Sequence, residues 1–370
     1  MSNVLIVCNT VLQVIFAVNL KFTEYMTDSV DLIISDHTAS AKKIVDNSQK
    51  LKSFENVYYS ENKEFVKSDA ALISSGALGY YKDRINKRKI LKKYIKLERS
   101  YDILLAANPD KFTNLLYEEL LSKNKRLRYF LYEDGLSAYC VLGEILKRQR
   151  CAKVSMIHRL FDSLTGKKNA SLNIQGVFLT NPLLCKWDLG IPFLTMCKIQ
   201  KNKALLDCLN EMFGYNNLLD KYKEQYVFFE ESYYEEKIKV NDVQLVEEIA
   251  KIIGKENLMI KIHPRNSVNR FREMGYKTNS NTFIPWELIM LNENYDDKIL
   301  LSIASGSVAN PFLYLGIKTK TIILMKCAEG DFGASGNIYN DFLLNSVYLK
   351  NKDIFIIPES IEQLKGVLKQ

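Results

Sequence analysis

The chain is poor in the residues that build metal and disulfide sites. Its 370 residues include three histidines and seven cysteines, and the cysteines form no C-x-x-C pair. A multi-histidine or thiolate metal centre therefore lacks ligands, and an odd, scattered set of thiols does not indicate a disulfide framework. We expect reduced, mostly buried thiols, and neither a metal nor another cofactor.

Signals for membranes and for common nucleotide motifs are also missing. No stretch reaches the roughly 18 consecutive apolar residues that a membrane-spanning helix needs. The first residues, 1–7, lead into an apolar strand without the basic region or cleavage site of a secretory signal, so we expect a cytoplasmic protein. Neither G-x-G-x-x-G nor G-x-x-x-x-G-K-[ST] occurs, and dinucleotide and P-loop phosphate sites are therefore not indicated.

What the chain does have is enough apolar material for two cores. Apolar residues make up 47% and charged residues 25% of the sequence, as in ordinary globular proteins. A chain of this length suits two α/β domains of roughly 150 to 200 residues each. With only seven Pro and 16 Gly, no low-complexity linker separates them.

Short apolar runs alternate with helical patterns twice along the chain, which predicts two parallel sheets. We expect Rossmann-like domains facing a cleft, as in GT-B glycosyltransferases, with domains at 1–185 and 225–370 and a linker at 186–224. The predicted strands are 3–7, 30–35, 56–59, 101–106, 127–132, 225–229, 258–262, 298–303, 320–325 and 353–357, and helices are predicted at 11–21, 243–253, 308–315 and 360–368.

Positive charge is concentrated in one segment. Residues 81–100 contain nine Lys or Arg and two acids, and so account for most of the net charge of +8. Apolar residues interrupt this run at helical spacing, which predicts a basic amphipathic helix. A solvated helix face explains it, and so does attachment to an anionic membrane surface or an acidic acceptor. Nucleic acid is a poorer match because no base-stacking aromatic motif accompanies the charges.

The first motif that could carry chemistry is Glu133-Asp134-Gly135, directly after a predicted strand. In open parallel sheets ligands bind beyond the carboxyl ends of the strands. Asp134 is therefore a candidate general base for a sugar hydroxyl, with Glu133 beside it. A turn that only closes the strand is the structural alternative.

The second motif, Lys261-Ile262-His263-Pro264, also follows an apolar strand. A histidine held there, with the next residue fixed by the proline ring, can protonate or hydrogen-bond a leaving phosphate near neutral pH. Lys261 adds a positive charge or a donor for a nucleotide. A purely structural histidine is the alternative.

A third motif, Ser305-Gly306-Ser307, precedes a predicted helix. Its hydroxyls can cap the helix, and free amides at such a turn can bind phosphate. Glu287, after Pro285-Trp286, suits ribose hydroxyls or is a first-turn helix charge. Together these groups give leaving-group stabilisation without a metal.

With these motifs in this order, the chain resembles the bacterial lipooligosaccharide and capsule sialyltransferases. That family combines acid-acid-Gly, His-Pro and serine-rich motifs, and its members begin with a Thr-Pro-x-Gln element that Thr10 to Gln13 matches, with Val11 in place of proline. The resemblance places Asn9, Thr10 and Gln13 among the donor-binding residues.

The resemblance further implies a role for each motif. Asp134 would deprotonate the acceptor hydroxyl, and His263 would stabilise or protonate the departing CMP. Lys261 would lie near the cytidine, Glu287 would bind its ribose, and Pro264 would be a further donor-binding residue. The turn Ser305, Gly306 and Ser307 would hold the phosphate. Some members place the base in the second half, where this chain offers Glu230, Glu231 and Glu235.

The expected function is therefore an inverting, metal-independent transfer of sialic acid from CMP-sialic acid. The expected acceptor is a galactose-type hydroxyl of a capsule repeat unit or lipooligosaccharide. We expect the enzyme at the inner face of the cell membrane, and a homodimer is a family-level expectation. The alternatives are a CDP-glycerol-type polymer transferase, a UDP-sugar transferase of the same fold, and a non-catalytic scaffold for polysaccharide assembly.

Overall fold

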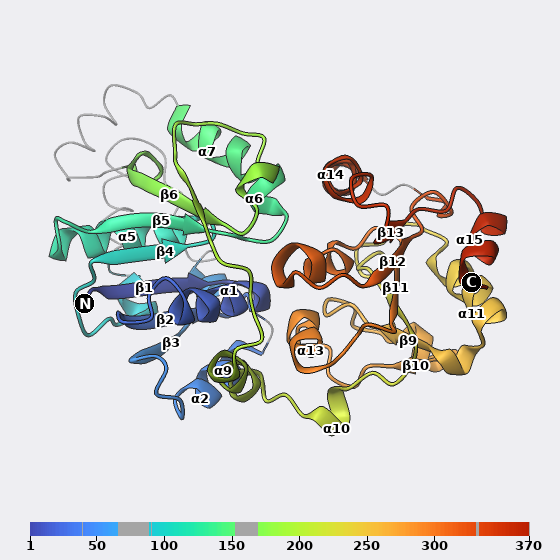
Figure 1. The fold of residues 1–370 in the computed structure, drawn as a ribbon. Coiled ribbons are helices and arrows are strands. Elements are labelled where there is room, and N and C mark those ends of the chain that lie inside the picture. Colours follow the sequence, from blue (N-terminus) through green and yellow to red (C-terminus); the bar gives the residue numbers. More distant parts are fainter. Residues whose placement is uncertain (39, 66–88, 90, 152–168, 331–332, 370) are drawn as a thin grey trace. The chain divides into compact units, whose positions relative to one another are not determined.

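The computed structural model describes residues 1–38, 40–65, 89, 91–151, 169–330 and 333–369. The chain divides into two compact units, residues 1–197 with 207–214 and residues 198–206 with 215–370. Each unit is built on one parallel β-sheet, and both sheets can be followed in Figure 1. The expected pair of Rossmann-like α/β domains is confirmed.

The first sheet has seven strands in the order β3-β2-β1-β4-β5-β6-β7, and all its pairings are parallel. Its strands are β1 Asn3–Cys8, β2 Ser29–Ser35, β3 Asn56–Ser60, β4 Ile103–Ala106, β5 Arg128–Tyr132, β6 Ile174–Leu179 and β7 Phe193–Thr195. Its helices are α1 Val11–Phe22, α2 Ala41–Ser48, α5 Lys111–Lys123, α6 Ser137–Cys140 and α7 Leu142–Cys151. Its 3₁₀ turns are η1 Ala170–Asn173 and η2 Pro182–Leu184. The boundary between the two units falls within α9 Lys203–Phe213.

The second sheet has six parallel strands in the order β10-β9-β8-β11-β12-β13. They are β8 Tyr226–Phe229, β9 Leu258–Lys261, β10 Lys277–Thr278, β11 Ile299–Ser302, β12 Lys320–Ile323 and β13 Phe355–Ile356. The α-helices are α10 Asn217–Asp220, α11 Asp242–Ile253, α12 Arg270–Glu273, α13 Trp286–Asn292, α14 Gly333–Leu343 and α15 Ile361–Leu368; the 3₁₀ turns are η3 Lys255–Asn257 and η4 Gly306–Val308, and the π-helical turns are η5 Pro311–Leu315 and η6 Leu344–Tyr348.

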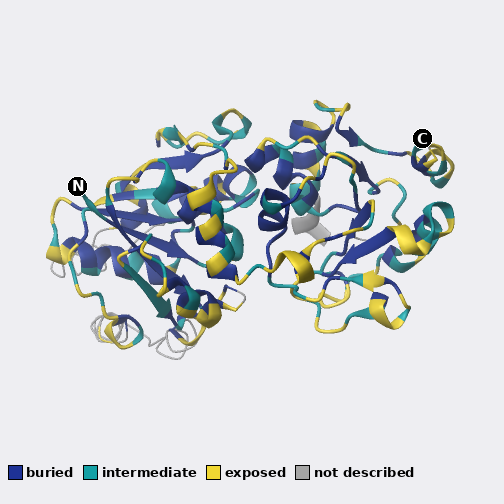
Figure 2. Cartoon of the chain, turned by 60° about the horizontal axis from the view of Figure 1, so that its bottom comes forward, coloured by how far each residue is buried: buried dark blue, intermediate teal, exposed yellow. Residues whose placement is uncertain are grey.

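Two strands of each sheet are buried along their whole length. Every residue of β2, β4, β8 and β9 is buried, and Figure 2 shows dark blue strands inside both units. Parallel strands covered on both faces read as unbroken apolar runs, which is why the sequence predicts them closely. In the second unit, the buried core includes Phe228, Ile260 and Leu301, which come from three neighbouring strands.

Three expectations differ from the structure. The predicted linker at 186–224 contains β7, which pairs with β6, and the helices α9 and α10. The predicted helix at 308–315 is a 3₁₀ turn followed by the π-helix η5, because Pro311 has no backbone N–H for a regular helical hydrogen bond. The seven cysteines are all free thiols, but the expectation that most are buried is wrong, since only Cys8 and Cys208 are buried and the other five are half-buried or exposed.

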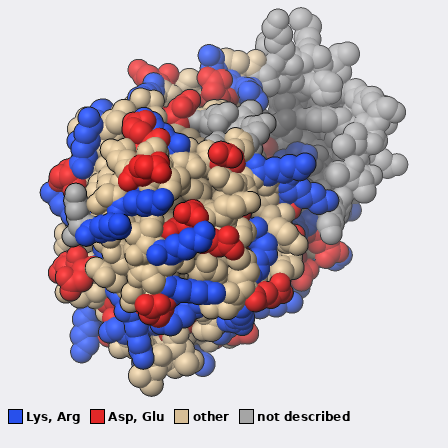
Figure 3. Space-filling view, turned by 90° about the vertical axis from the view of Figure 1, so that its right-hand side faces the viewer, with Lys and Arg blue, Asp and Glu red and all other residues tan. Residues whose placement is uncertain are grey.

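The basic segment is only partly described, since residues 81–88 and 90 lie outside the described part of the chain. Within it, residues 91–94 are helical. Arg99, at its end, is bound to the buried Asp31 by an ion pair of 2.7 Å and is therefore not a free surface charge. On the face shown in Figure 3, Lys and Arg alternate with Asp and Glu.

No helix in the described ranges is long and apolar enough to cross a membrane.

Candidate functional site

In the first unit, polar side chains follow three neighbouring strands, β1, β4 and β5. Asn9 and Thr10 come after β1, Asn108 after β4 and Asp134 after β5. The carboxyl ends of parallel strands lie at one edge of a sheet, so these residues share that edge. The fold therefore places the acid motif where open α/β sheets bind ligands.

Asp134 is held by three uncharged donors. One carboxylate oxygen accepts a hydrogen bond from the Gln13 side-chain amide. The other accepts from Asn108 Nδ2 at 2.7 Å and from Ser137 Oγ at 3.0 Å. The next residue, Gly135, has φ of 58°, a conformation that a side chain disfavours. The carboxylate is half-buried and fixed in direction, as a general base for a hydroxyl requires.

The predicted donor-binding residues of the first strand end support this arrangement. Thr10 Oγ1 accepts the backbone N–H of Gln13 at 3.2 Å and so caps α1. Gln13 Oε1 in turn accepts the N–H of Asn9 at 2.6 Å, and Asn9 Nδ2 donates to Asp110 at 3.1 Å. These three residues lie in the same unit as Asp134, and their roles in donor binding stay predictions.

Glu133 differs from its neighbour Asp134 because it is completely buried. Its carboxylate accepts the backbone N–H of Thr180 at 2.7 Å. It also contacts the Tyr139 hydroxyl, and burial followed by the charge of Glu133 raises the pKa of that tyrosine. These contacts tie the segment after β6 to the acid motif. The catalytic role expected for Glu133 stays a prediction, and its contacts favour a structural one.

In the second unit, the candidate residues follow the neighbouring strands β9, β8 and β11. The last residues of these strands are in register: Phe229 of β8 pairs with Lys261 on one side and Ser302 on the other. The His-Pro and serine motifs thus begin at one edge of the second sheet, on either side of β8.

Lys261 and Glu287 are both buried ionisable groups. Burial lowers the pKa of Lys261 to about 8, and the charge of Glu287 opposes this shift. Burial raises the pKa of Glu287, and Asn310 and Lys261 oppose that shift by stabilising the carboxylate. Asn310 Nδ2 donates a hydrogen bond to Glu287. In the described part of the chain, no hydrogen bond or ion pair occupies the Lys261 ammonium, which leaves it able to receive an anion.

His263 is set up to donate a hydrogen bond. The backbone N–H of Arg265 donates to His263 Nδ1 at 3.2 Å, so the hydrogen of the neutral ring is on Nε2. Burial, with the charges of Arg265 and Lys261, lowers the pKa of His263 to about 4. The ring is therefore neutral at pH 7, and an anion bound beside it would raise its pKa. Pro264, the next residue, is exposed.

The serine motif forms a tight turn after β11. Ser302 Oγ accepts the N–H of Ser305 at 2.8 Å, and Ser305 Oγ accepts the N–H of Ser307 at 3.3 Å. Ser305 is thus the cap of the 3₁₀ turn η4, which confirms its capping role. The half-buried Gly306 and Ser307 complete the turn. Phosphate binding by this turn stays a prediction.

Several residues of these two arrangements are not apparent from the sequence. Asn108 and Ser137 bind Asp134, and Asn310 binds Glu287. Asn108 precedes Pro109 at a strand end, which is a turn signal; the other two have no such signal. Of the alternative bases, Glu235 is exposed and accepts a hydrogen bond from Ser267 Oγ at 2.8 Å.

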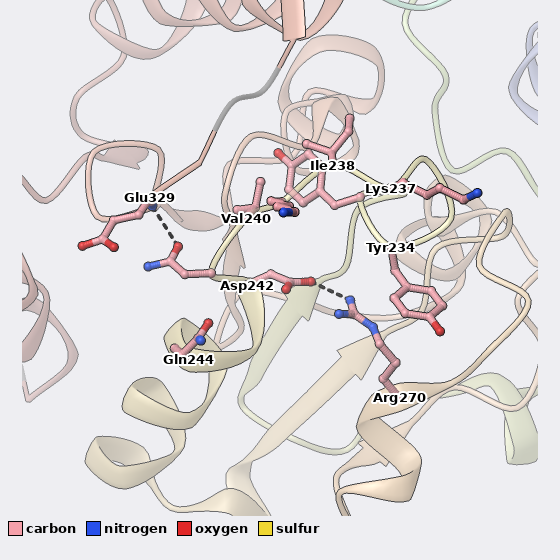
Figure 4. Close-up of a pocket in the computed structure, with 11 residues that line it drawn as sticks. Tyr234, Lys237, Ile238, Val240, Asp242, Gln244, Arg270 and Glu329 are labelled. Atoms are coloured by element: carbon pink, nitrogen blue, oxygen red, sulfur yellow. Dashed lines mark hydrogen bonds and ion pairs between the residues drawn. The ribbon is translucent and has the colours of Figure 1, made fainter.

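A cavity of about 600 Å³ opens beside the segment that follows β8. Figure 4 shows Asp242 and Arg270 on its wall, joined by an ion pair of 2.6 Å, and Glu329 on another side. Arg270 also lies over the ring of Tyr234 at 4.8 Å. Lys261, His263 and Glu287 do not line this cavity, but Arg270 also pairs with Glu230, which contacts His263.

The fold is that of the GT-B glycosyltransferases. An α/β-galactoside α-2,3-sialyltransferase from the luminous marine bacterium Photobacterium phosphoreum is 12% identical, with a TM-score of 0.52 over 98% of this chain and 100% of that one. The calicheamicin glycosyltransferase CalG4 is 8% identical, with a TM-score of 0.51 over 100% and 89% of the two chains. UGT2 of Phytolacca americana, with UDP-2-fluoro-glucose and pterostilbene, is 10% identical, with a TM-score of 0.51 over 100% and 90%.

A sequence match identifies the family of this chain among the GT-B glycosyltransferases. Residues 4–324 match the model of the alpha-2,8-polysialyltransferase family. The chain belongs to this family of sialyltransferases, which confirms the resemblance drawn from its motifs. A search of curated proteins gives no match.

Proposed function

We propose that this protein transfers sialic acid from CMP-sialic acid to a sugar hydroxyl. The observation that carries the proposal is the grouping in the second unit of Lys261, His263 and Glu287 at and near one sheet edge, beside the serine turn. It offers a cation, a neutral hydrogen-bond donor, a carboxylate and polar backbone for a nucleoside monophosphate. Membership of a sialyltransferase family supports the same donor.

In the proposed reaction, Asp134 accepts the proton of the acceptor hydroxyl as its oxygen attacks the anomeric carbon of the donor. The bond between that carbon and the phosphate oxygen breaks, and CMP leaves with the bonding electrons. The neutral His263 ring donates a hydrogen bond from its Nε2–H to the departing phosphate and keeps its proton, and Lys261 offsets the phosphate's negative charge. Because CMP-sialic acid is a β-glycoside, an α-linked product requires inversion. No step needs a metal.

For the acceptor, we propose the 8-hydroxyl of a terminal sialic acid on an oligosialic chain. The family description names an α-2,8 linkage and a polymer, and this replaces a galactose-type hydroxyl as the preferred acceptor. Offering oligosialic acid and a galactoside side by side tests the choice. Extension of the oligosialic acid supports it, and transfer to the galactoside alone contradicts it.

The donor is tested by isothermal titration of the protein, treated with a metal chelator, against CMP, CDP and UMP. We expect selective CMP binding that is weakened about tenfold or more in Lys261→Ala and Glu287→Ala and unchanged in Lys352→Ala, an exposed lysine of the same unit. Preference for CDP would indicate a CDP-glycerol-type transferase, and preference for UMP a UDP-sugar transferase. Full biological function of an Asp134→Asn, His263→Ala double variant would indicate a scaffold.

We also propose attachment to an anionic lipid surface at the inner face of the cell membrane. Lys92, Lys93 and Lys96 are exposed. A cavity of about 340 Å³ beside them is lined by apolar Leu97 and Leu116, by lysines and by Glu119, which pairs with Lys92 at 3.5 Å. Apolar area with basic residues at its rim suits such lipids.

Co-sedimentation with phosphatidylglycerol vesicles tests this attachment, with phosphatidylcholine vesicles as the neutral comparison. Changing the three lysines 92, 93 and 96 to Glu should abolish binding to the anionic vesicles. Changing the exposed lysines 350, 352 and 369 to Glu is the matched control. Equal binding of the two triple variants contradicts the proposal.

A further inference from the structure

Two consecutive acids, Glu230 and Glu231, follow β8 directly and contact different neighbours. The strand β8 lies between β9, which leads to His263, and β11, which leads to the serine turn. Glu230 contacts the first of these loops and Glu231 the second. Glu230 and Glu231 therefore contact the His263 loop and the serine turn, the two loops that we propose bind the leaving phosphate.

Glu230 fixes the loop after β9. Its backbone N–H donates to the carbonyl of Lys261 at 3.0 Å, and its carboxylate accepts the N–H of His263 at 3.2 Å. The other carboxylate oxygen is 3.1 Å from the guanidinium of Arg270, which also pairs with Asp242 (Figure 4). The Glu230 side chain is completely buried, and Arg270 balances its charge.

Glu231 fixes the loop after β11. Its Oε1 accepts the N–H of Ala304 at 2.6 Å and the hydroxyl of Ser302 at 3.1 Å. The Tyr233 hydroxyl and the N–H of Ser305 also stabilise this carboxylate. Ser302 and Ser305 belong to the serine turn itself, because Ser302 Oγ accepts the Ser305 N–H. No Lys or Arg pairs with Glu231 in the described ranges of the chain.

We propose that Glu230 and Glu231 are positioning residues that together set the separation between His263 and the serine turn. Each carboxylate accepts a backbone N–H from one of the two loops, which is the contact that positioning of a loop requires. This inference rests on the proposed function for its catalytic meaning. The contacts that it describes exist in the protein without substrate.

Hydrogen exchange of the substrate-free protein tests the positioning itself. Glu230→Ala should increase amide exchange in a peptide spanning 262–267, and Glu231→Ala in one spanning 303–308, each by about tenfold or more because a backbone donor loses its acceptor. Glu248→Ala, which removes an exposed carboxylate on α11, is the control and should change neither peptide. Unchanged exchange in both peptides would overturn the proposal, whatever the protein's substrate.

Kinetics then separates positioning from proton transfer. The side-chain oxygen of glutamine still accepts hydrogen bonds, so Glu231→Gln should keep activity within about threefold, while Glu231→Ala should raise the donor KM and the Kd for CMP at least about tenfold. For a base, Gln and Ala would both lower kcat by about 10² or more and leave CMP binding intact. That result would overturn the assignment of Glu231.

Glu230 has its own expected pattern. Glu230→Gln keeps the acceptor for the His263 N–H but loses the ion pair with Arg270. We expect kcat to fall about threefold in Glu230→Gln and about 30-fold in Glu230→Ala, with CMP affinity changed less than in Glu231→Ala. Equal kcat in the two Glu230 variants would overturn its positioning role. Absence of CMP binding by the wild type would instead contradict the proposed function and leave the exchange test intact.

Discussion

The two sheets present different chemistry at their carboxyl edges. At the first, Asp134 is held by uncharged amide and hydroxyl groups. At the second, Lys261 and Glu287 are buried with opposed pKa shifts, and the pKa of His263 is lowered to about 4. The first edge therefore presents one fixed carboxylate. The second edge suits an incoming anion, because an anion bound there would stabilise the protonated forms of both Lys261 and His263.

Because the two edges differ in this way, mutations should separate proton removal from the acceptor from binding and departure of the nucleotide. Removing the carboxylate of Asp134 should alter proton removal from the acceptor and leave nucleotide binding unchanged. Changes at the second edge should alter nucleotide binding or departure.

The largest effect is expected at the first edge. Asp134→Asn removes the proton acceptor but can keep much of the hydrogen-bonding geometry, so kcat should fall by about 10² to 10⁴. Titration with CMP should give the wild-type Kd. Asp46→Asn, an exposed change in the same unit, should be silent in both assays. A variant that also loses CMP binding would break the comparison.

His263→Ala should produce the next largest effect, a fall in kcat of about 10² from loss of the donor to the leaving phosphate. Steady-state kinetics should show a smaller change in KM. The exposed His37 provides the matched control, His37→Ala. Near wild-type kcat in a folded His263→Ala protein would remove this residue from the mechanism.

Lys261 gives a pH test. Its pKa is lowered to about 8, so it is a cation below that pH and neutral above it. CMP affinity should fall as the pH rises through and beyond 8, since bound phosphate raises the lysine's pKa. In Lys261→Met, affinity at pH 7 should be about tenfold weaker, as expected for loss of about 1.4 kcal/mol, and the alkaline decline should disappear. Titrations from pH 6 to 9.5 measure both, and a decline that persists in the variant would assign it to another group.

The smallest effect distinguishes the two roles of the serine turn. If Ser305 acts only as the cap of η4, Ser305→Ala should lower the free energy of unfolding by about 1 kcal/mol and leave the Kd for CMP unchanged. We expect this outcome because the contact that the structure gives the Ser305 hydroxyl is the capping hydrogen bond from the Ser307 N–H. A loss of CMP affinity without a loss of stability in denaturant titrations would show that the hydroxyl binds phosphate.

The sequence predicted the two sheets well because their central strands are buried on both faces and read as apolar runs. The motifs at the strand ends followed from the same pattern, since each lies directly after such a run. Three strands, β6, β7 and β10, were not predicted. The strand β7 is short, only half-buried and close to Gly190 and Pro192. It is stabilised by pairing with β6 rather than by its own composition.

The contacts of the candidate site could not be predicted, because they join residues far apart in the chain. Gln13 and Asp134 are 121 positions apart, and Glu287 and Asn310 are 23 apart. Likewise, Glu230 and Glu231 look in the sequence like any pair of candidate bases. Only the order β9-β8-β11 shows which loops they contact.

Gln13 limits how this protein can vary. Its amide oxygen accepts the Asn9 N–H at the start of α1, and its amide nitrogen donates to Asp134. Among flexible side chains of that length, glutamate only accepts, lysine and arginine only donate, and methionine does neither strongly. A substitution that kept the helix start would therefore disturb the acid, and one that kept the acid would disturb the helix start. Stability and activity are bound together at this position, and a search for more stable variants would have to leave it untouched.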